Sequence, residues 1–353
     1  MSGDPIRTNF LAALPFWLSL GYLPVIALAG WQGGWWLALT PVFGWWIMSV
    51  VDVIGGLRTE NADPETPDES LRWYTLITLI WPFLQVLLVF GALAYVSWSD
   101  RLGTRESWIF MATVGIASGT IGINYAHELM HQKSRFERFL GDMLMTMVLY
   151  GHFRSEHLLV HHRYVGTPRD PVTARYNEGF HRFFRRVLVS CLRSAFKAEK
   201  AMLARKGLPA YHRSNPFWRY AAWQAGWLLL AYVIGGWAGV GMFCLQAFVA
   251  VWQLELVNYG LTRRHLGNGK YEHVLPRHSW NAAHRVTNYV LINLQRHSDH
   301  HYKPSRRFPL LQTYDAEEAP QLPYTYPIMT IMAMMPPVWR RYLNPKVRAG
   351  RRK

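Results

Sequence analysis

The chain has 353 residues, 38 lysines and arginines against 22 acidic residues, and a formal net charge of +16. Half of the residues are apolar and only 17% are charged, which excludes a disordered chain, and two cysteines exclude a small domain held together by disulfides. Two cysteines are also too few for a thiolate zinc or iron–sulfur site, so a bound metal would depend mainly on other ligands, of which the 15 histidines are the largest supply.

Six stretches without a charged residue recur along the chain, each close to the ~20 residues that a helix needs to cross a bilayer. They are Phe10–Gly30, Trp35–Val51, Trp73–Trp98, Trp108–Ala126, Tyr220–Gly235 and Trp237–Leu254. Tryptophan or tyrosine near their ends is typical of membrane–water interfaces. We therefore predict an all-α integral membrane bundle of about six transmembrane helices, and we expect no cleavable signal peptide.

The links between these stretches indicate how the helices pair and how they are oriented. Residues 31–34 and Gly235–Gly236 are long enough only for tight turns, so the first two and the last two helices should form hairpins. These turns carry no charge, whereas residues 132–219 contain 17 lysines and arginines against 6 acidic residues. The positive-inside rule then predicts a multi-pass protein of the inner (cytoplasmic) membrane with both termini and this insert in the cytoplasm.

We expect one membrane domain, residues 1–353, with the basic insert at about 132–219 and a cytoplasmic C-terminal region from about residue 260. Within that region, Tyr326–Leu343 is too short and too broken by prolines to span, and should lie at the membrane interface. The charge of the insert fits a solvated surface that meets anionic lipid, or a docking face for an acidic soluble partner. No nucleic acid partner is expected, because no recognised binding motif accompanies the charge.

Eight of the histidines form three tight clusters, all on the predicted cytoplasmic side. The clusters are His127-Glu-Leu-Met-His131, His157-Leu-Leu-Val-His161-His162 and His297-Ser-Asp-His300-His301. Each contains a pair four residues apart, which share one face of a helix. Neutral imidazole suits zinc, copper, iron and nickel, but a catalytic zinc usually takes three protein ligands. Eight imidazoles are more economically explained by two ions, and iron would direct such a site toward oxygen chemistry.

The first cluster also fits the His-Glu-x-x-His pattern of zinc metalloproteases, in which Glu128 would be the general base. An intramembrane protease would leave the other two clusters without a role. Acidic residues near the clusters are instead candidates for orienting imidazoles from behind, or are carboxylates beside a basic region. These residues are Glu128, Glu156, Asp299 and Asp170.

At the histidine clusters the sequence resembles the integral-membrane alkane monooxygenase family, which belongs with the membrane fatty acid desaturases and hydroxylases. The matching stretches are His127–His131, Glu156–His162, Arg277–Asn281 and Leu294–His301. The resemblance implies two non-haem iron ions held by the eight histidines, and hydroxylation of the terminal carbon of an alkane with O2 and electrons from rubredoxin. A fatty-acyl desaturase or hydroxylase is the alternative within the same chemistry. For His278, in the third stretch, a packing role and a role behind the ligands are both open.

The chain departs from the family at one further box, Asn-Tyr-x-Glu-His-Tyr-Gly, whose histidine resembles a ninth metal ligand. Here Asn258-Tyr259 runs directly into Gly260-Leu261, so that histidine is missing. His265 and Glu255 are candidate replacements, and a binding or scaffold protein that has lost its metal is a further alternative. The chain also lacks the four cysteines of the rubredoxin that some relatives carry as a fusion, so the electron donor should be a separate protein, and the basic insert could receive it.

An alkane offers no polar group to recognise, so selectivity should come from the shape of a channel between the helices. Trp45 and Trp46 in the second apolar stretch are candidates for setting the length of that channel. The alternative for each is an ordinary packing or interfacial tryptophan.

Overall fold

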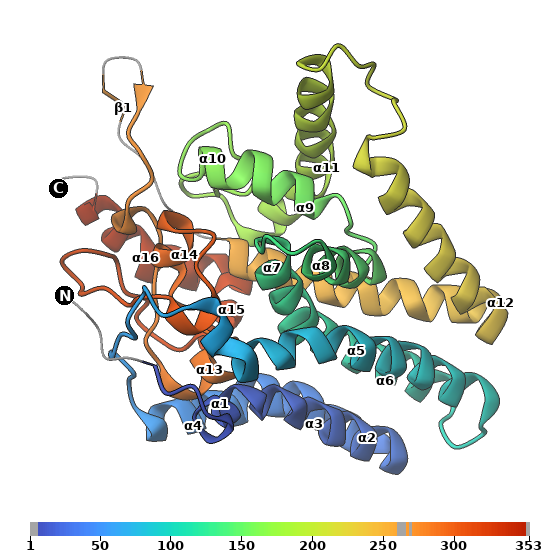
Figure 1. Ribbon diagram of the computed structural model, residues 1–353. Coiled ribbons are helices and arrows are strands. Elements are labelled where there is room, and N and C mark those ends of the chain that lie inside the picture. The colour runs from blue at the N-terminus through green and yellow to red at the C-terminus, as the bar shows by residue number, and fades with distance from the viewer. Residues whose placement is uncertain (1–5, 260–265, 268–269, 351–353) are drawn as a thin grey trace.

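The computed structural model describes residues 6–259, 266–267 and 270–350. Helices make up most of these residues, which confirms the all-α prediction, and the strands among them are the two-residue pair β1 (Leu266–Gly267) and β2 (Lys270–Tyr271). In Figure 1 the long helices lie alongside one another, and both ends of the chain lie at the same end of this bundle.

Five helical regions in the described part of the chain are long and apolar enough to cross a membrane. They are Phe10–Gln32, Gly34–Gly55, Asp68–Trp98, Thr104–Met130 and Pro216–Asn258. Short 3-10 or π-helical turns interrupt the first, second and fourth regions, and one precedes the α-helix of the third. The elements are α1 (Phe10–Ala13), η1 (Leu14–Gly21), α2 (Tyr22–Gln32), η2 (Gly34–Ala38), α3 (Leu39–Pro41), η3 (Val42–Ile47), α4 (Met48–Gly55), η4 (Asp68–Leu71), α5 (Arg72–Trp98), α6 (Thr104–Ala117), η5 (Ser118–Ile123), α7 (Asn124–Met130) and α12 (Pro216–Asn258).

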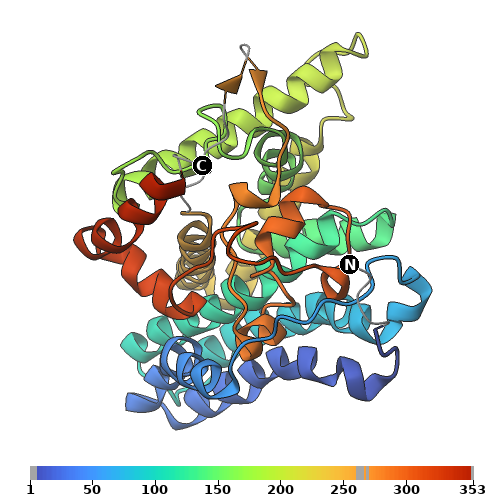
Figure 2. The ribbon, with the colours of Figure 1, turned by 90° about the vertical axis from the view of Figure 1, so that its left-hand side faces the viewer.

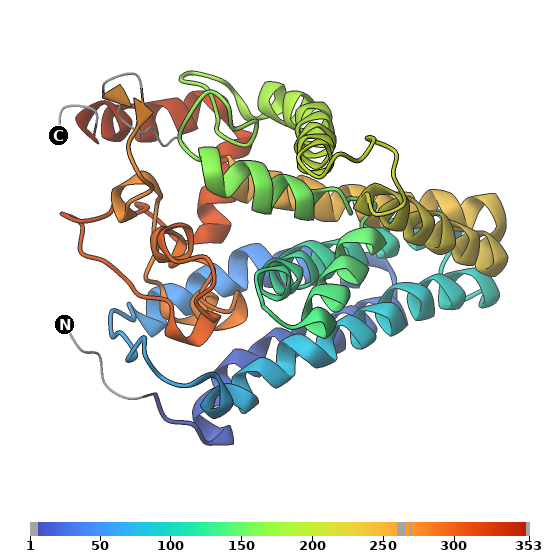
Figure 3. The same ribbon diagram turned by 45° about the horizontal axis from the view of Figure 1, so that its top comes forward.

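The longest region, α12, is bent sharply in its middle. Its backbone leaves the helical conformation at Gly235 and Gly236, and Gly236 has a φ of 60°, which glycine adopts readily because it has no Cβ. The two halves therefore form the hairpin that the sequence predicts at this glycine pair. Figure 3 shows α12 beside α5 and α6, the helices against which it packs.

Three short links between the apolar stretches, at residues 31–34, 99–103 and 235–236, meet at one end of the bundle. The backbone N–H of Gly34 donates to Glu106 Oε1 at 2.7 Å, and Arg101 Nε donates to the carbonyl of Trp31 at 2.8 Å. Trp98 Nε1 donates to the carbonyl of Ile234, next to the bend of α12, at 3.0 Å. These contacts tie the predicted turns together at the end of the bundle that lies away from the chain termini (Figure 1).

The basic insert folds as helices against the bundle. Its elements are α8 (Arg135–Met147), α9 (Phe153–Glu156), η6 (His157–His161), α10 (His162–Tyr164) and α11 (Phe180–Ala204). Helix α11 buries Phe180, Phe183, Val187, Cys191 and Ala195, a spacing that places all five on one face of a helix. Because this face packs against α9 and η6, α11 supports the second histidine cluster from outside.

The C-terminal segments cover the end of the bundle that bears the termini (Figure 2). They are η7 (Pro276–His278), α13 (Arg285–Val290), α14 (His297–Tyr302), η8 (Phe308–Leu310), α15 (Tyr326–Met334) and α16 (Pro336–Gly350). Asp52, in α4, caps α13 by accepting hydrogen bonds from the backbone N–H groups of Val286 and Thr287, both at 2.8 Å. The stretch that the sequence predicts as interfacial is broken at Met335, and α15 packs against α4 and α12.

Helices α6 and α12 approach each other closely at a glycine. A Cβ added at Gly115 would lie 2.6 Å from the carbonyl oxygen of Gln246 in α12, whereas one added at Gly91 in α5 would meet nothing within 4 Å. Small residues allow backbones to approach in this way in membrane bundles. The position of α12 therefore depends on glycine at residue 115. The C-terminal end of α12 places Asn258 at the cavity that the histidines line.

We expect Gly115→Ala to lower the stability of the bundle by about 1–3 kcal/mol, because the added methyl group must push the two helices apart. The midpoint of thermal unfolding in detergent should fall accordingly. Gly91→Ala is the matched control and should leave the midpoint unchanged or raise it slightly. Equal midpoints for the two variants would contradict the close packing of α6 on α12.

Candidate metal centre

Three helical segments bring all eight clustered histidines to one place. His127 lies in α7 and His131 at its C-terminal end, the second cluster lies in η6 and α10, and the third lies in α14. They divide into two groups. Within each group, every histidine has a ring nitrogen that lies within 4.8 Å of those of the other members. The first group is His127, His131, His157, His162 and His300, and the second is His161, His297 and His301.

The division follows from the local helix geometry and differs from the grouping that the sequence suggests. A spacing of four residues predicts that His157 and His161 point to the same place. However, η6 is a π-helical turn, in which the N–H of His162 bonds to the carbonyl of His157, five residues earlier. His157 and His162 therefore lie on the same side and enter the first group, and His161 enters the second.

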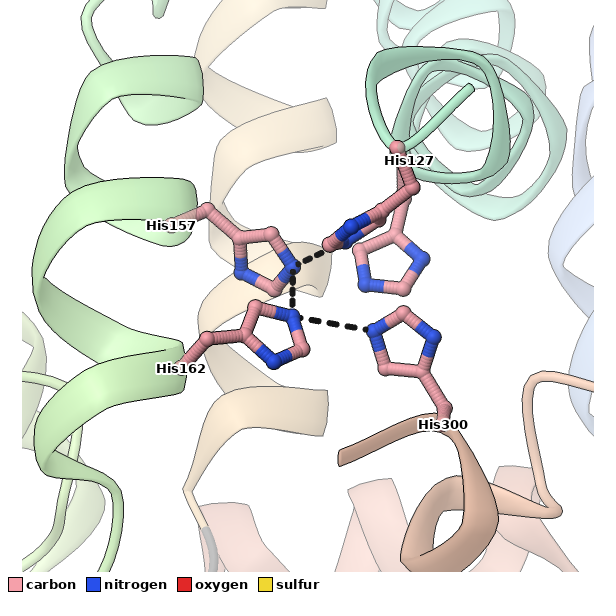
Figure 4. A group of neighbouring side chains, drawn as sticks. His127, His157, His162 and His300 are labelled. Atoms are coloured by element: carbon pink, nitrogen blue, oxygen red, sulfur yellow. Dashed lines mark hydrogen bonds between the residues drawn. The ribbon is translucent and has the colours of Figure 1, made fainter. Parts of the chain in front are cut away.

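In the first group, ring nitrogens approach each other closely (Figure 4). His157 Nε2 lies 3.0 Å from His131 Nε2 and 2.9 Å from His162 Nε2. His300 Nε2 lies 3.2 Å from His162 Nε2. The ring of His127 completes the group, with its centroid 4.3 Å from that of His300.

The second group adjoins the first. His161 Nε2 lies 3.1 Å from His301 Nε2, and the ring centroids of His297 and His301 are 4.2 Å apart. The ring of His161 stacks on that of His157 with centroids 5.3 Å apart, so one helical turn contributes to both groups. The two groups can therefore act on one bound molecule.

The nitrogen contacts fit bound cations better than hydrogen bonds. A neutral imidazole Nε2 can either donate one hydrogen or accept one, yet the Nε2 atoms of His157 and His162 each face two other Nε2 atoms. A metal ion ~2.0–2.1 Å from each nitrogen separates neighbouring ligand nitrogens by about 2.9–3.4 Å, which is the spacing seen here. The donor set therefore suits one metal ion in each group.

The imidazoles are in the protonation state that binds metals. Burial lowers the pKa of His131 and of His297 to about 3. Burial, together with the neighbouring imidazoles, holds the pKa values of His157, His162 and His300 well below their usual range. These rings are thus neutral at physiological pH, and a lone pair is available to a metal ion.

Two residues orient histidines of the second group by contacting the ring nitrogen that faces away from the other imidazoles. His161 Nδ1 lies 3.0 Å from Asp170 Oδ2, and His301 Nδ1 lies 2.6 Å from Ser279 Oγ. Each contact turns Nε2 of its histidine toward the other ring, as in many metal sites where the outer nitrogen donates to a carboxylate or hydroxyl. Asp170 is one of the four acidic candidates predicted from the sequence. Ser279 is not among the predicted residues, although it lies within the stretch Arg277–Asn281 that resembles the family.

Two of the other three acidic candidates, Glu128 and Asp299, form contacts with the surrounding chain instead. Glu128 Oε1 accepts hydrogen bonds from Gln132 Nε2 at 2.9 Å and from the backbone N–H of Phe308 at 3.3 Å. Asp299 pairs with Arg306 and accepts from the Tyr314 hydroxyl at 2.6 Å. Glu156 is fully buried without a hydrogen-bond partner among the described residues, and burial beside other carboxylates raises its pKa well above the usual range.

No carboxylate joins either imidazole group within the described residues, and His265 lies outside them. Glu255, one of the two candidate replacements, accepts hydrogen bonds from the Tyr150 hydroxyl at 3.0 Å and from Asn258 Nδ2 at 3.2 Å. His278 Nε2 lies 2.8 Å from Glu272 Oε1, so this histidine forms a contact within its own loop and belongs to neither imidazole group.

An apolar cavity of about 110 Å³ runs from the centre into the helices. Histidines of both groups line it, namely His127, His157, His161 and His297. It continues along one face of the fourth helical region, from His127 back to Ile116, a path of about 16 Å. Trp45 also lines it, fixed by a 3.0 Å hydrogen bond from Nε1 to Thr330 Oγ1, whereas Trp46 is 57% exposed and does not.

Comparisons with known proteins agree with this architecture. The fatty acid desaturase family model matches residues 106–332, which include all three histidine clusters. The chain is 37% identical over 349 residues to alkane 1-monooxygenase 2 of Pseudomonas aeruginosa, covering 95% of this chain and 88% of the relative. It is 34% identical over 355 residues to alkane 1-monooxygenase 2 of Alcanivorax borkumensis, covering 95% and 90%. It is 27% identical over 239 residues to the xylene/toluene monooxygenase hydroxylase component of Pseudomonas putida, covering 65% and 62%.

We expect Asp299→Ala to destabilise the protein by about 3–5 kcal/mol, because Arg306 then lacks its partner in a largely buried position. Tyr314→Phe removes one hydrogen bond to the same carboxylate and should cost about 1 kcal/mol. Thermal unfolding of both variants, prepared free of metal, measures these costs. A loss that appears only in metal-loaded protein would mean that Asp299 acts on the ligands and not on the surrounding fold.

Proposed function

Because the chain belongs to the alkane 1-monooxygenase family, within the fatty acid desaturase family, we propose that it hydroxylates the terminal carbon of an alkane at two iron ions. It is an oxidoreductase, and the described part of the chain contains five helical regions long and apolar enough to cross a membrane and three histidine clusters that meet in space. The observation that carries the proposal is the meeting of eight imidazoles in adjoining groups of five and three.

One iron would be held by His127, His131, His157, His162 and His300, and the other by His161, His297 and His301. When bound, the pair would supply activation of O2, with one oxygen atom going to the substrate and the other leaving as water after uptake of two electrons and two protons. Burial lowers the pKa values of His131, His157, His162, His297 and His300, which favours neutral rings. Asp170 and Ser279 keep the rings of His161 and His301 in their orientation.

The cavity supports an unbranched apolar substrate. Its path follows Ile116, Gly119, Thr120 and Ile123 on one helix face and ends at His127, so an extended chain would reach the histidines end first. Only the terminal carbon would then lie beside the metal centre, which accounts for selectivity without a polar contact. The apolar walls also keep water away from the reacting end.

We propose the inner membrane as the location, with both termini and the histidines on the cytoplasmic side. The excess of positive charge in the insert supports this orientation, and the uncharged turns lie at the other end of the bundle. A separate rubredoxin would then deliver electrons from the cytoplasm.

Metal analysis of the purified protein tests the proposal. We expect about two irons per chain, and His297→Ala should lower both the iron content and alkane hydroxylation because it removes a ligand. His181→Ala, at an exposed histidine outside the clusters, is the control and should change neither. One zinc without iron would favour a metalloprotease, and protein that takes up no metal would favour a scaffold. Conversion of fatty-acyl chains but not octane would favour a desaturase or fatty-acyl hydroxylase.

Trp45 should set the longest substrate that fits. We expect Trp45→Ala to shift the preference toward longer alkanes, because the indole lines the cavity, whereas Trp46→Ala should leave the preference unchanged. Product yields across a series of alkanes measure both effects. Equal behaviour of the two variants would show that the substrate does not follow the cavity past Trp45.

A further inference from the structure

A wide basic hollow of about 710 Å³ lies beside the second imidazole group, between the loop that follows α10 and helix α11. Arg169, Arg175, Arg193 and Lys197 line it, and all four are exposed. Arg186 also lines it but pairs with Glu178 at 2.7 Å. Among the described lining residues the one acidic side chain is Asp170, so the hollow presents an excess of positive charge to an approaching molecule.

Asp170 connects this hollow to the metal centre. It forms part of the wall of the hollow, and only 2% of its surface is exposed. Its carboxylate is held by the backbone N–H of Val172 at 2.9 Å and by the Thr173 hydroxyl at 2.7 Å. The same carboxylate lies 3.0 Å from His161 Nδ1, and His161 belongs to the second imidazole group. One hydrogen bond therefore joins the wall of the hollow to a histidine of the centre.

A second basic hollow has fewer cations without an acidic or hydrogen-bonding partner, and its described residues have no link to the histidines. It is lined by Arg135, Arg138, Arg154 and Arg219. Arg154 and Arg219 share Asp142, each at 2.7 Å, and Arg138 donates to two backbone carbonyls. No clustered histidine is among its described lining residues. Both the free charge and the link to the histidines thus favour the hollow beside Asp170.

We propose that the hollow lined by Arg169, Arg175, Arg193 and Lys197 is the docking site of an acidic one-electron carrier protein, and that Asp170 and His161 form the entry for its electrons. This inference rests on the proposed function. In each encounter the carrier loses one electron and the metal centre gains one, so two encounters supply the two electrons that accompany one O2. Asp170 is a positioning residue, because it acts through His161.

Anaerobic stopped-flow mixing of reduced rubredoxin with the oxidised iron-loaded protein tests the docking site. Arg169→Glu with Arg193→Glu should lower the second-order rate of electron transfer by about tenfold or more at low salt, and should weaken its salt dependence. Lys133→Glu with Arg135→Glu makes the same change of charge outside the hollow and should have little effect. Dithionite, which needs no docking site, should reduce all three proteins at equal rates.

Asp170→Asn tests the entry route. It should leave the rubredoxin concentration at half-maximal rate unchanged and lower the limiting rate of electron transfer per bound iron, by more than it lowers the rate of reduction by dithionite. If rubredoxin reduces the Arg169→Glu/Arg193→Glu variant as fast as the wild-type protein, the proposed docking site is wrong. This holds also if the variant has lost affinity for anionic vesicles, because the hollow would then bind lipid and not the carrier. An unchanged limiting rate in Asp170→Asn would overturn the route. If the wild-type protein takes up no iron, the proposed function itself fails.

Discussion

Eight imidazoles can share one buried space only if all of them stay uncharged and face common centres. Burial lowers the pKa values of His131, His157, His162, His297 and His300, but several ring nitrogens stand opposed at about 3 Å with too few hydrogens between them. The surrounding fold must therefore hold these rings in place. Helix α11 supports the second cluster from outside, and Asp170 and Ser279 hold two rings from behind.

Residues far apart in the sequence hold the segment that carries the third histidine cluster. Arg296, only 2% exposed and next to His297, donates to the carbonyls of Leu311 at 2.6 Å and Glu60 at 2.9 Å. Asp52 caps α13 from the second membrane helix. The N-terminal hairpin is thus fastened to the segment that carries the last three histidines, although more than 200 residues separate them along the chain.

Much of this architecture could be predicted from the sequence, because apolar length and clustered histidines are strong local signals. The hairpin at Gly235–Gly236 and the convergence of the eight histidines are both seen in the structure. The division into groups of five and three could not be predicted, because residue spacing does not distinguish an α-turn from the π-turn at His157–His161. Asp170, and not Glu128, contacts the outer nitrogen of a ring because of the conformation of the loop that follows α10, which the spacing of residues in the sequence does not reveal. Glu255 likewise bonds to Tyr150 and not to a histidine, a pairing across 105 residues.

Both imidazole groups draw on the third cluster, with His300 in one and His297 and His301 in the other. During translation five of the eight histidines are made by residue 162, but the first group is completed only at residue 300 and the second only at residue 301. The nascent chain must therefore insert most of its helices while its early histidines remain without their final neighbours. Uptake of a metal ion by either group would consequently be a late event in biogenesis, after synthesis of the five long apolar helical regions of the described chain.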